Sequence, residues 1–367
     1  MTPADLSATV LHAVRSAVDE HVLRAPVPAR VRVERTRPGG RGDYASAVAL
    51  QLAGPAALTA REVAEILRER VAGAPGIGRV EITGPGFLNF TLDATADAHR
   101  SLVDRVREQG PRYGYGDALA GTSSHFSHPR EVRAAVTADA VGRLVRAQGA
   151  LVRISCDEEP DPDWVRLGIA ADTEGPPSPA SAPTRIRPVP AGAPAGELLD
   201  RLGPDATRWG LLRPAGHDRA PLGDELLLQA EGNALFLVRY AHARVHALTR
   251  GAALLGCTGA RDEAAGDTAG TLRDTPGAPA HALLDLLADH PAVLAAAARH
   301  GAPDRLARHL EAVAHAFLDF HDAASPLPVG DEKPSAAHRS RLALAEAAGT
   351  VLAGGLSLLG ISAPTYL

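Results

Sequence analysis

The sequence is poor in cysteine, lysine and aromatic residues, and it has no long apolar run. Its two cysteines, Cys156 and Cys257, form no Cys-x-x-Cys pair, a usage typical of a reducing compartment. Lys333 is the only lysine, whereas arginine, alanine, glycine and proline are abundant, so the arginine richness reflects a GC-rich genome more than a function. No apolar stretch approaches the roughly 20 uncharged residues of a membrane span. We therefore expect a cytoplasmic protein without a membrane partner.

Length and charge limit the classes of function. The 367 residues, 45% of them hydrophobic, suffice for two or three domains with cores of their own. The net charge is −5, and by segment it is +1 for residues 1–120, −1 for 121–220 and −5 for 221–367. A nonspecific binder of DNA or RNA usually carries a basic face, so this balance argues against that class. A binder that recognises one RNA shape through a few arginines remains open.

The first part of the chain, residues 1–117, has the pattern of a small α/β domain. Apolar residues recur every four positions from Leu6 to Val18, the period of one helical face. Thr59 followed by Glu62 is typical of a helix start. The expected elements are helices over residues 5–24 and 59–71 and strands over 30–35, 79–83 and 87–92.

The middle of the chain contains a proline-rich segment. Seven prolines lie between Asp172 and Glu197 among small residues. So few apolar side chains cannot offset the entropy of ordering the backbone, and we expect a mobile loop over residues 172–198. A second stretch of this kind, residues 256–280, separates two helical runs.

The last part, residues 222–367, has the period of an all-helical bundle. Helical spacing starts at Gly223, with Leu227 and Leu228 among the first apolar residues. Gly360 is placed to end the last helix as a left-handed cap, with Ile361 packing back on it. Three further helices are expected, over residues 283–294, 306–320 and 339–359, and in the middle one the apolar residues step by 4, 3, 4 and 3.

Four short segments resemble one known family. They are residues 42–46 (GDYAS), 84–90 (GPGFLNF), 238–244 (VRYAHAR) and 358–364 (LLGISAP). Their sequences and their order are similar to those of arginyl-tRNA synthetases, whose C-terminal domain is of the DALR anticodon-binding type. The resemblance implies an α/β plus all-α protein with three domains: an α/β tRNA-contacting domain over residues 1–117, a reduced Rossmann-type catalytic core over 118–221, and a DALR-like helical bundle over 222–367.

The middle of the chain departs from this family at both segments that bind ATP. Where the family has His-x-Gly-His, this chain has His128, Pro129, Arg130 and Glu131, and Glu131 would repel a phosphate. Where the family has Lys-Met-Ser-Lys, this chain has Thr184-Arg185-Ile186-Arg187. His128, Glu131, Arg185 and Arg187 are therefore degenerate catalytic positions. Between these segments, residues 151–183 leave room for about one strand and one crossover, too little for an adenylation site.

The resemblance also implies two groups of tRNA-binding residues. Phe87 would stack on an unpaired base of the D-loop and Asn89 would recognise a base edge, unless both are ordinary hairpin residues. Tyr240 and Arg244, one helical turn apart, would offer a ring to an anticodon base and a guanidinium to a phosphate. The alternative for them is a core tyrosine and a surface arginine. Leu237 stands where the family's helix often has another aromatic residue, which would leave a smaller anticodon pocket.

Structural roles are favoured for several other polar residues. Asp43 suits a turn or a helix cap, and Tyr44 can bury its ring while its hydroxyl finds a partner. His242 and His246 are four residues apart and could chelate a metal. No acid stands beside them, so we expect no metal site.

Two further groups in the middle segment allow a functional alternative. His125 and His128 could form a nucleotide-binding corner, but solvated loop histidines are the favoured interpretation. The acidic run over residues 157–163 (DEEPDPD) could bind Mg²⁺, but prolines interrupt it and a solvated loop is favoured.

Three functions remain open. The leading hypothesis is a pseudoenzyme related to translation that binds tRNA, with an arginine acceptor as the candidate, and that neither aminoacylates nor uses a cofactor. The second is a protein-interaction module that partners a synthetase or another enzyme, which the acidic C-terminal segment favours. The third is a minimal active arginine–tRNA ligase, which would need ATP and against which the altered segments argue.

Overall fold

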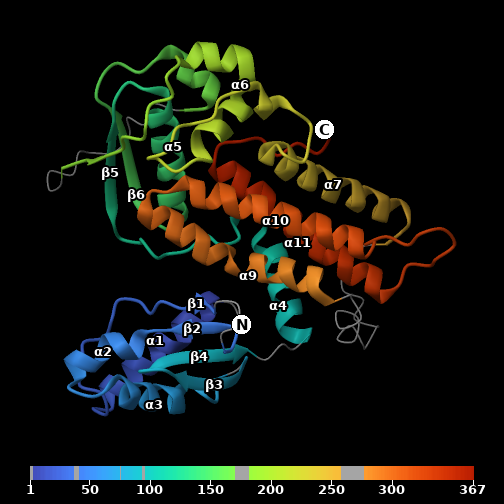
Figure 1. Cartoon of the computed structure of the whole chain (residues 1–367). Helices are drawn as coiled ribbons and strands as arrows, with labels where there is room; N and C mark the ends of the chain where they lie inside the picture. Colours follow the sequence, from blue (N-terminus) through green and yellow to red (C-terminus); the bar gives the residue numbers. More distant parts are fainter. Residues whose placement is uncertain (1–2, 37–40, 75, 93–95, 170–181, 258–276) are drawn as a thin grey trace. The chain divides into compact units, whose positions relative to one another are not determined.

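The chain forms two compact units in the computed structural model, residues 1–102 and 103–367 (Figure 1). The structure describes residues 3–36, 41–74, 76–92, 96–169, 182–257 and 277–367. The division lies at Leu102, within helix α4 (Ala96–Gln109), whereas the sequence suggested a boundary at residue 117. The segment after α4 already belongs to the second unit. It starts with the 3-10 helix η1 (Gly110–Arg112), and Tyr113 Oη donates to Leu287 O at 3.0 Å.

The first unit is a four-stranded antiparallel sheet packed against three helices. In the order β1-β2-β4-β3, its strands are β1 (Glu34–Arg35), β2 (Tyr44–Ser46), β4 (Phe87–Leu92) and β3 (Ile77–Thr83), and its helices are α1 (Pro3–Asp19), α2 (Val48–Ala56) and α3 (Ala60–Val71). The expected face of α1 is confirmed, because Leu6, Val10 and Val14 are fully buried. The helix start at Thr59 is confirmed too: its hydroxyl accepts from the Glu62 amide at 3.2 Å.

Two boundaries in this unit differ from the sequence expectation. Of the strand expected over residues 30–35, only the last two residues pair with β2, because the carbonyl of Arg32 accepts a hydrogen bond from Ser46 Oγ (2.8 Å) in place of a ladder bond. Helix α1 ends before the expected residue 24. His21 adopts a left-handed backbone with φ of 60°, and the next two amides bond back to the carbonyl of Ala17.

The second unit begins with a three-stranded parallel sheet in the order β6-β5-β7. The strands are β5 (Ser123–His128), β6 (Leu151–Cys156) and β7 (Thr184–Arg185), and α5 (Val132–Ala147) is the crossover from β5 to β6. One face of the sheet packs on α5, where Ile154 lies against Gly142. On the other face His125 Nε2 and Ser155 Oγ share a hydrogen bond of 2.9 Å. Polar side chains thus occupy the face that a larger Rossmann-type sheet covers with helices.

The proline-rich segment is only partly a loop. Residues 170–181, on which much of the expected mobile loop falls, lie outside the described residues. After them β7 forms, and the Ile186 amide donates to Ser127 O at 2.8 Å. The loop expected to reach residue 198 ends earlier, because α6 (Ala195–Leu212) buries Leu198 completely. Most of the second stretch, residues 258–276, also lies outside the described residues.

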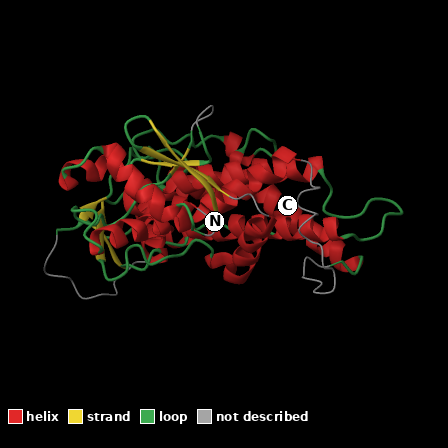
Figure 2. Ribbon diagram, turned by 90° about the horizontal axis from the view of Figure 1, so that it is seen from below, coloured by secondary structure: helices red, strands yellow, loops and turns green. Residues whose placement is uncertain are grey.

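The rest of the second unit is a bundle of long helices, which dominate the view in Figure 2. They are α7 (Ala234–Leu254), α9 (Gly277–His300), α10 (Pro303–Ala323) and α11 (Ala336–Leu358). The helical face predicted from Leu306 to Phe320 is confirmed, since its five apolar residues are at most 1% exposed. The left-handed cap is confirmed as well: Gly360 has φ of 70°, and the Ile361 amide donates to Leu356 O at 2.9 Å. None of the described helices combines the length and apolar character needed to cross a bilayer.

The start of the first long helix differs from the expectation. Helical structure from Gly223 is limited to the 3-10 turn η3 (Asp224–Leu227), and Leu227 and Leu228 are about half exposed. The α-helix starts at Ala234, because the side-chain oxygen of Asn233 accepts from two amides of the first turn. Its side-chain nitrogen donates to the carbonyls of Leu226 and Leu228, which fixes the irregular segment before the helix.

Two histidines are buried side by side in the helical bundle. His290 in α9 is 1% exposed and His309 in α10 is 8% exposed, with ring centroids 5.3 Å apart. Tyr113 stacks on His290 at 5.8 Å. His290 Nδ1 and His309 Nε2 are buried without a hydrogen-bond partner among the described residues. Burial lowers the pKa of His309 to about 4 and the pKa of His290 well below its usual value.

We expect the protein to lose stability as the pH falls from about 6.5 to 4. Both pKa values are depressed in the folded state, so below about 6.5 the unfolded chain takes up protons that the folded chain resists. For His309 alone the loss by pH 4 is roughly 3 kcal/mol. Urea denaturation across this pH range measures it.

His309→Gln should reduce this pH dependence, because it removes one titrating group. His315→Phe, which replaces an exposed histidine of the same helix, is the matched control. An equal pH dependence in the wild type and in His309→Gln would contradict the assignment.

Candidate functional site

The hairpin of the first unit presents one aromatic ring to solvent. Phe87 opens β4 opposite Thr83, and its side chain is 39% exposed. Asn89 is only 6% exposed, and its Nδ2 donates to Thr83 Oγ1 at 2.7 Å and to Phe87 O at 3.4 Å. The amide expected to recognise a base edge is therefore engaged inside the hairpin, where it holds the turn that carries Phe87.

Helix α7 presents a second aromatic surface, in the other unit. Tyr240 is 39% exposed and Arg244, one turn later, is exposed, with its Nε 3.3 Å from His321 Nε2. Phe236 stacks on Tyr240 with ring centroids 5.7 Å apart and an angle of 22°. The sequence interpretation missed Phe236, although its position four residues before Tyr240 places both rings on one face. Leu237 is buried, so it belongs to the core and not to this surface.

The N-terminus of α5 is closed by the protein's own carboxylate. Glu131 is the N-cap, and its Oε2 accepts from the Ala134 amide at 2.8 Å. Its Oε1 accepts from the Ala191 amide, also at 2.8 Å. A helix N-terminus attracts anions through its unpaired amides and its dipole. Glu131 supplies such an anion from within the chain.

The two histidines of β5 are strand residues and not the solvated loop residues that the sequence favoured. His128 is 4% exposed, and its Nδ1 donates to Pro129 O at 2.9 Å. Its ring lies 5.7 Å from that of Trp164. His125 is half-buried and pairs with Ser155. The correction follows from parallel pairing with β6 along the whole of β5, which a solvated loop would lack.

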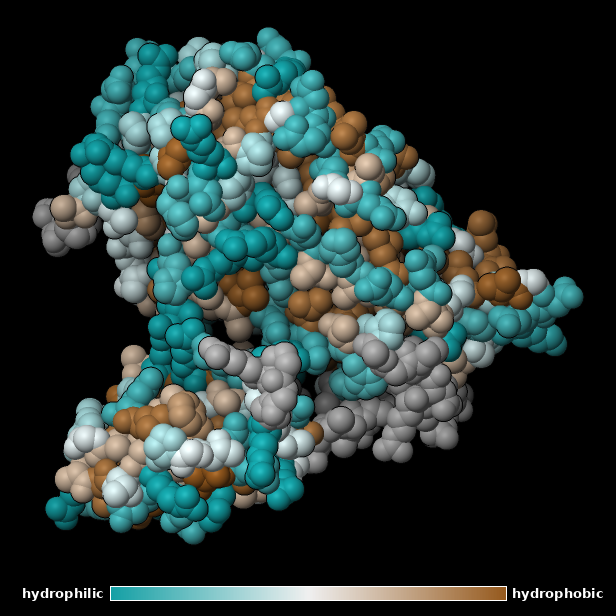
Figure 3. All heavy atoms as spheres, viewed as in Figure 1, coloured by the Kyte–Doolittle hydropathy of each residue, from teal (hydrophilic) through white to brown (hydrophobic). Residues whose placement is uncertain are grey.

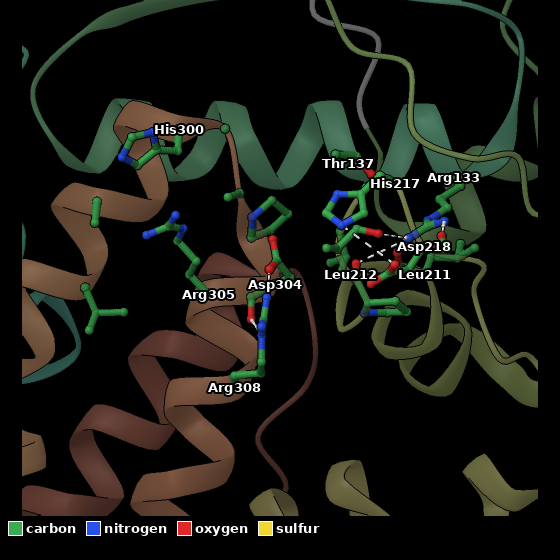
Figure 4. Close-up of a pocket in the computed structure, with 18 residues that line it drawn as sticks. Arg133, Thr137, Leu211, Leu212, His217, Asp218, His300, Asp304, Arg305 and Arg308 are labelled. Carbon is green, nitrogen blue, oxygen red and sulfur yellow. Dashed lines mark hydrogen bonds and ion pairs between the residues drawn. The ribbon is translucent and has the colours of Figure 1, made fainter.

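Arg133 is completely buried at the start of α5, and its guanidinium is saturated (Figure 4). Burial is the largest influence on its pKa and lowers it. It lines a cavity of about 820 Å³ whose opposite wall includes His300 and Arg305. It donates to five backbone carbonyls at 2.6 to 3.2 Å, those of Val189, Leu211, Pro214, Ala215 and Asp218. Its charge therefore fixes the segments on either side of α6.

The second segment expected to be degenerate, residues 184–187, lies at the short strand β7. Arg185 and Arg187 are both exposed, and Arg185 Nη2 lies 2.5 Å from Asp157 Oδ2. Asp157 is the first residue of the acidic run, so this run is not simply a solvated loop. Farther along it, Asp161 accepts from the amide of Asp163, which starts the 3-10 helix η2 (Pro162–Leu167).

The remaining polar candidates have structural partners. Tyr44 is buried and its hydroxyl accepts from Arg35 Nη2 at 3.1 Å, as expected. Asp43 Oδ2 accepts from the Leu92 amide at 2.8 Å, a structural contact with a distant segment and not the turn or helix cap that the sequence suggested.

His242 and His246 lie together on α7. His242 is 3% exposed, burial lowers its pKa, and its Nδ1 donates to Pro364 O at 2.9 Å. The His246 ring meets it edge-on at 4.6 Å. Within the described ranges no three histidine, cysteine or acidic residues gather as metal ligands.

Comparison with known proteins matches both ends of the chain to described domains. Residues 6–92 match the arginyl tRNA synthetase N terminal domain, and residues 238–367 match the DALR anticodon binding domain. An arginine–tRNA ligase from Renibacterium salmoninarum is 27% identical over 556 aligned positions, covering 99% of this chain and 100% of that protein. The arginine–tRNA ligase from Frankia alni is 28% identical over 557 positions with the same coverage.

Solved structures show the same fold. The arginyl-tRNA synthetase of Thermus thermophilus superposes with a TM-score of 0.66 at 15% identity and covers 100% of both chains. The arginyl-tRNA synthetase of Plasmodium falciparum gives 0.65 at 9% identity, covering 100% of this chain and 99% of that chain. The protein is thus a mixed α/β structure with a helical C-terminal domain of the DALR type.

The sequence alignments are longer than this chain. The alignment with the Renibacterium ligase has 556 positions, whereas this chain has 367 residues. About a third of the aligned positions therefore have no residue of this chain opposite them. Both end domains match at residues 6–92 and 238–367, which leaves the middle of the chain as the part where residues are lacking.

We expect Glu131→Gln to destabilise the second unit by about 1–2 kcal/mol, because it removes the negative charge at the start of α5 and weakens two hydrogen bonds. Thermal and urea denaturation measure the change. Glu158→Gln, at an exposed position after β6 in the same unit, should leave stability within about 0.5 kcal/mol. Equal effects of the two substitutions would show that Glu131 does not serve as the cap.

Proposed function

This chain belongs to the arginyl-tRNA synthetase family, and from that membership we propose that it binds tRNA without activating arginine. The proposal makes it a pseudoenzyme that keeps the two domains by which such proteins contact tRNA. An arginine acceptor tRNA is the candidate ligand because of the family. No cofactor is required for this function.

The observation that carries the proposal is the closed N-terminus of α5. In the family's His-x-Gly-His segment this terminus faces ATP phosphates, and here Glu131 accepts from the Ala134 amide of the helix with one oxygen and from the Ala191 amide with the other. A triphosphate placed there would have to displace a carboxylate that is already bonded twice and would otherwise repel it. Arg130, which replaces the family's glycine, adds a side chain where adenine would approach the backbone.

The reduced sheet supports the same conclusion. Class I synthetases bind ATP and the amino acid at the carboxyl ends of a larger parallel sheet. Here β7 contributes two residues, and it pairs with β5 only at Phe126 and Ser127. Thr184 and Arg187 stand at the two lysines of the second ATP-binding segment, and Arg185 between them pairs with Asp157.

An active arginine–tRNA ligase is the second candidate function. The observation in its favour is that relatives named arginine–tRNA ligase align with 99% of this chain. This alternative would require ATP at the α5 terminus and arginine in a pocket built from the short middle segment.

The proposed tRNA interface consists of two aromatic surfaces, one in each unit. Phe87 would stack on an unpaired base, with Asn89 holding the hairpin that carries it. Tyr240, backed by Phe236, would stack on an anticodon base, while Arg244 would contact a phosphate. If these surfaces do not bind RNA, the acidic C-terminal segment would favour a protein-interaction module that partners a synthetase.

We expect no arginine-dependent exchange of pyrophosphate into ATP above a no-enzyme control, because Glu131 occupies the helix N-terminus where the triphosphate would bind. The measurement uses the full chain with Mg-ATP, arginine and total tRNA. His128→Ala is the matched control: an exchange activity that this substitution abolishes would establish the ligase alternative and contradict the proposal.

We expect Phe87→Ala and Tyr240→Ala each to weaken tRNA binding by about 1–3 kcal/mol, the scale for one base stacked on one ring. Arg244→Ala should chiefly reduce the dependence of affinity on salt, since it removes a phosphate contact. Gel-shift titrations with total tRNA at fixed salt measure both effects.

Tyr115→Ala is the matched control for these aromatic substitutions, because Tyr115 is 37% exposed but lies on neither surface. Absence of tRNA binding by the intact protein would favour the interaction module. Equal binding by the wild type and by the Phe87→Ala, Tyr240→Ala double variant would show that tRNA binds elsewhere.

A further inference from the structure

The outer edge of strand β6 is open in the part of the chain that the structure describes. β6 is the end strand of the order β6-β5-β7, and its only neighbour among the described strands is β5. Leu151, at its start, is 75% exposed, and the rest of the strand is half-buried. The short core accounts for the opening, because a larger Rossmann-type sheet continues past its second strand.

Alternate residues of β6 direct their backbone groups toward β5 and away from it. The Leu151 amide donates to Thr122 O at 3.0 Å, and beyond the strand the Asp157 amide donates to His128 O at 2.9 Å. Val152, Ile154 and Cys156 alternate with the residues that bond to β5. Their amides and carbonyls therefore point to the open edge.

One of these edge groups has a partner. The Val152 carbonyl accepts from Arg146 Nη2 at 3.2 Å. The three amides and the other two carbonyls have none among the described residues. They form a row of donors and acceptors at the spacing of a sheet ladder, which is the template for a further strand.

We propose that two copies of this chain associate through β6, with the two edges antiparallel, to form one continuous six-stranded sheet. An antiparallel pair of identical edges is closed by a two-fold axis, so it stops at a dimer. Pairing centred on Ile154 uses the whole strand and places Val152 of one copy opposite Cys156 of the other.

The charges around β6 select the antiparallel arrangement and a second copy as the partner. Residues 157–159 (DEE) follow the strand directly, whereas Arg146 and Arg153 lie near its start. Parallel pairing would set two acidic ends side by side, while antiparallel pairing sets each acidic end beside a basic start. One copy carries both halves of this charge pattern, with Arg146 at the end of α5 and the acidic residues after β6, so a second copy complements it.

Two other features fit this partner. The strand LVRISC contains neither proline nor lysine, the residues that often block pairing at natural edges. On the face of the molecule shown in Figure 3, hydrophobic residues form several separate patches. That face therefore offers no single large apolar surface as an alternative site for binding a second copy.

Sedimentation velocity of the full chain over a wide concentration range tests the proposal. We expect a reversible dimer. Val152→Pro removes one edge amide in each copy and should raise the dimer dissociation constant at least about tenfold. Val152→Thr keeps the amide and the branched side chain and is the matched control. A monomer at every concentration, or a dimer that Val152→Pro leaves unchanged, would overturn the proposal.

A disulfide trap tests the register independently and does not depend on the folding of the proline variant. Val152→Cys should form an intermolecular disulfide with the native Cys156 of a second copy under mild oxidation. The double variant Val152→Cys, Cys156→Ser should not cross-link, and the buried Cys257 is common to both. Failure of the single variant to cross-link, or cross-linking by the double variant, would overturn the pairing centred on Ile154.

Discussion

The second unit depends on a buried ion pair between Arg208 in α6 and Asp139 in α5. Arg208 is 1% exposed, and its Nη2 lies 2.5 Å from Asp139 Oδ2. Its Nε and Nη1 donate to the carbonyls of Leu359 and Leu167, each at 2.8 Å. Burial lowers the pKa of Arg208, and the negative charge of Asp139 opposes that shift. Removing one member of such a pair costs about 3–5 kcal/mol, because the other is left buried and uncompensated.

This one guanidinium joins the reduced core to the helical bundle. Leu359 caps α11 and Leu167 ends η2, so the two carbonyls belong to segments far apart in the sequence. Gly360 lies directly against the Arg208 side chain, where a Cβ would not fit. The glycine that ends the last helix is therefore required twice, for its left-handed backbone and for the close approach of Arg208.

Helix α5 is held in place by two charged residues at its start, Glu131 and Arg133. A helix N-terminus in a Rossmann-type core is a ready anion site, and Glu131 fills it from within. Arg133 donates to Val189 O while Glu131 accepts from the Ala191 amide, so α5 holds the last part of the proline-rich stretch in place. A segment held at both points is part of the folded structure of the second unit.

The sequence predicted the elements whose signals are local. The face of α1, the capping box at Thr59, the apolar steps of α10 and the cap at Gly360 each depend on residues within a few positions of one another. It also located the exposed rings, Phe87 and Tyr240, through their motifs. It did not foresee that Asn89 is turned inward to Thr83 or that Phe236 backs Tyr240, because these contacts depend on how strands and side chains meet across the structure.

By itself, then, the sequence determined the family and the order of the α/β and helical parts, since both follow from residue identity and spacing. Tertiary structure alone decided what the replacement residues do. Whether the Glu131 carboxylate is free or engaged within the chain depends on the Ala191 amide sixty residues away. Whether β6 is a central strand or an edge depends on which strands pair with it, and hydrogen bonds between distant segments form only once the chain is folded.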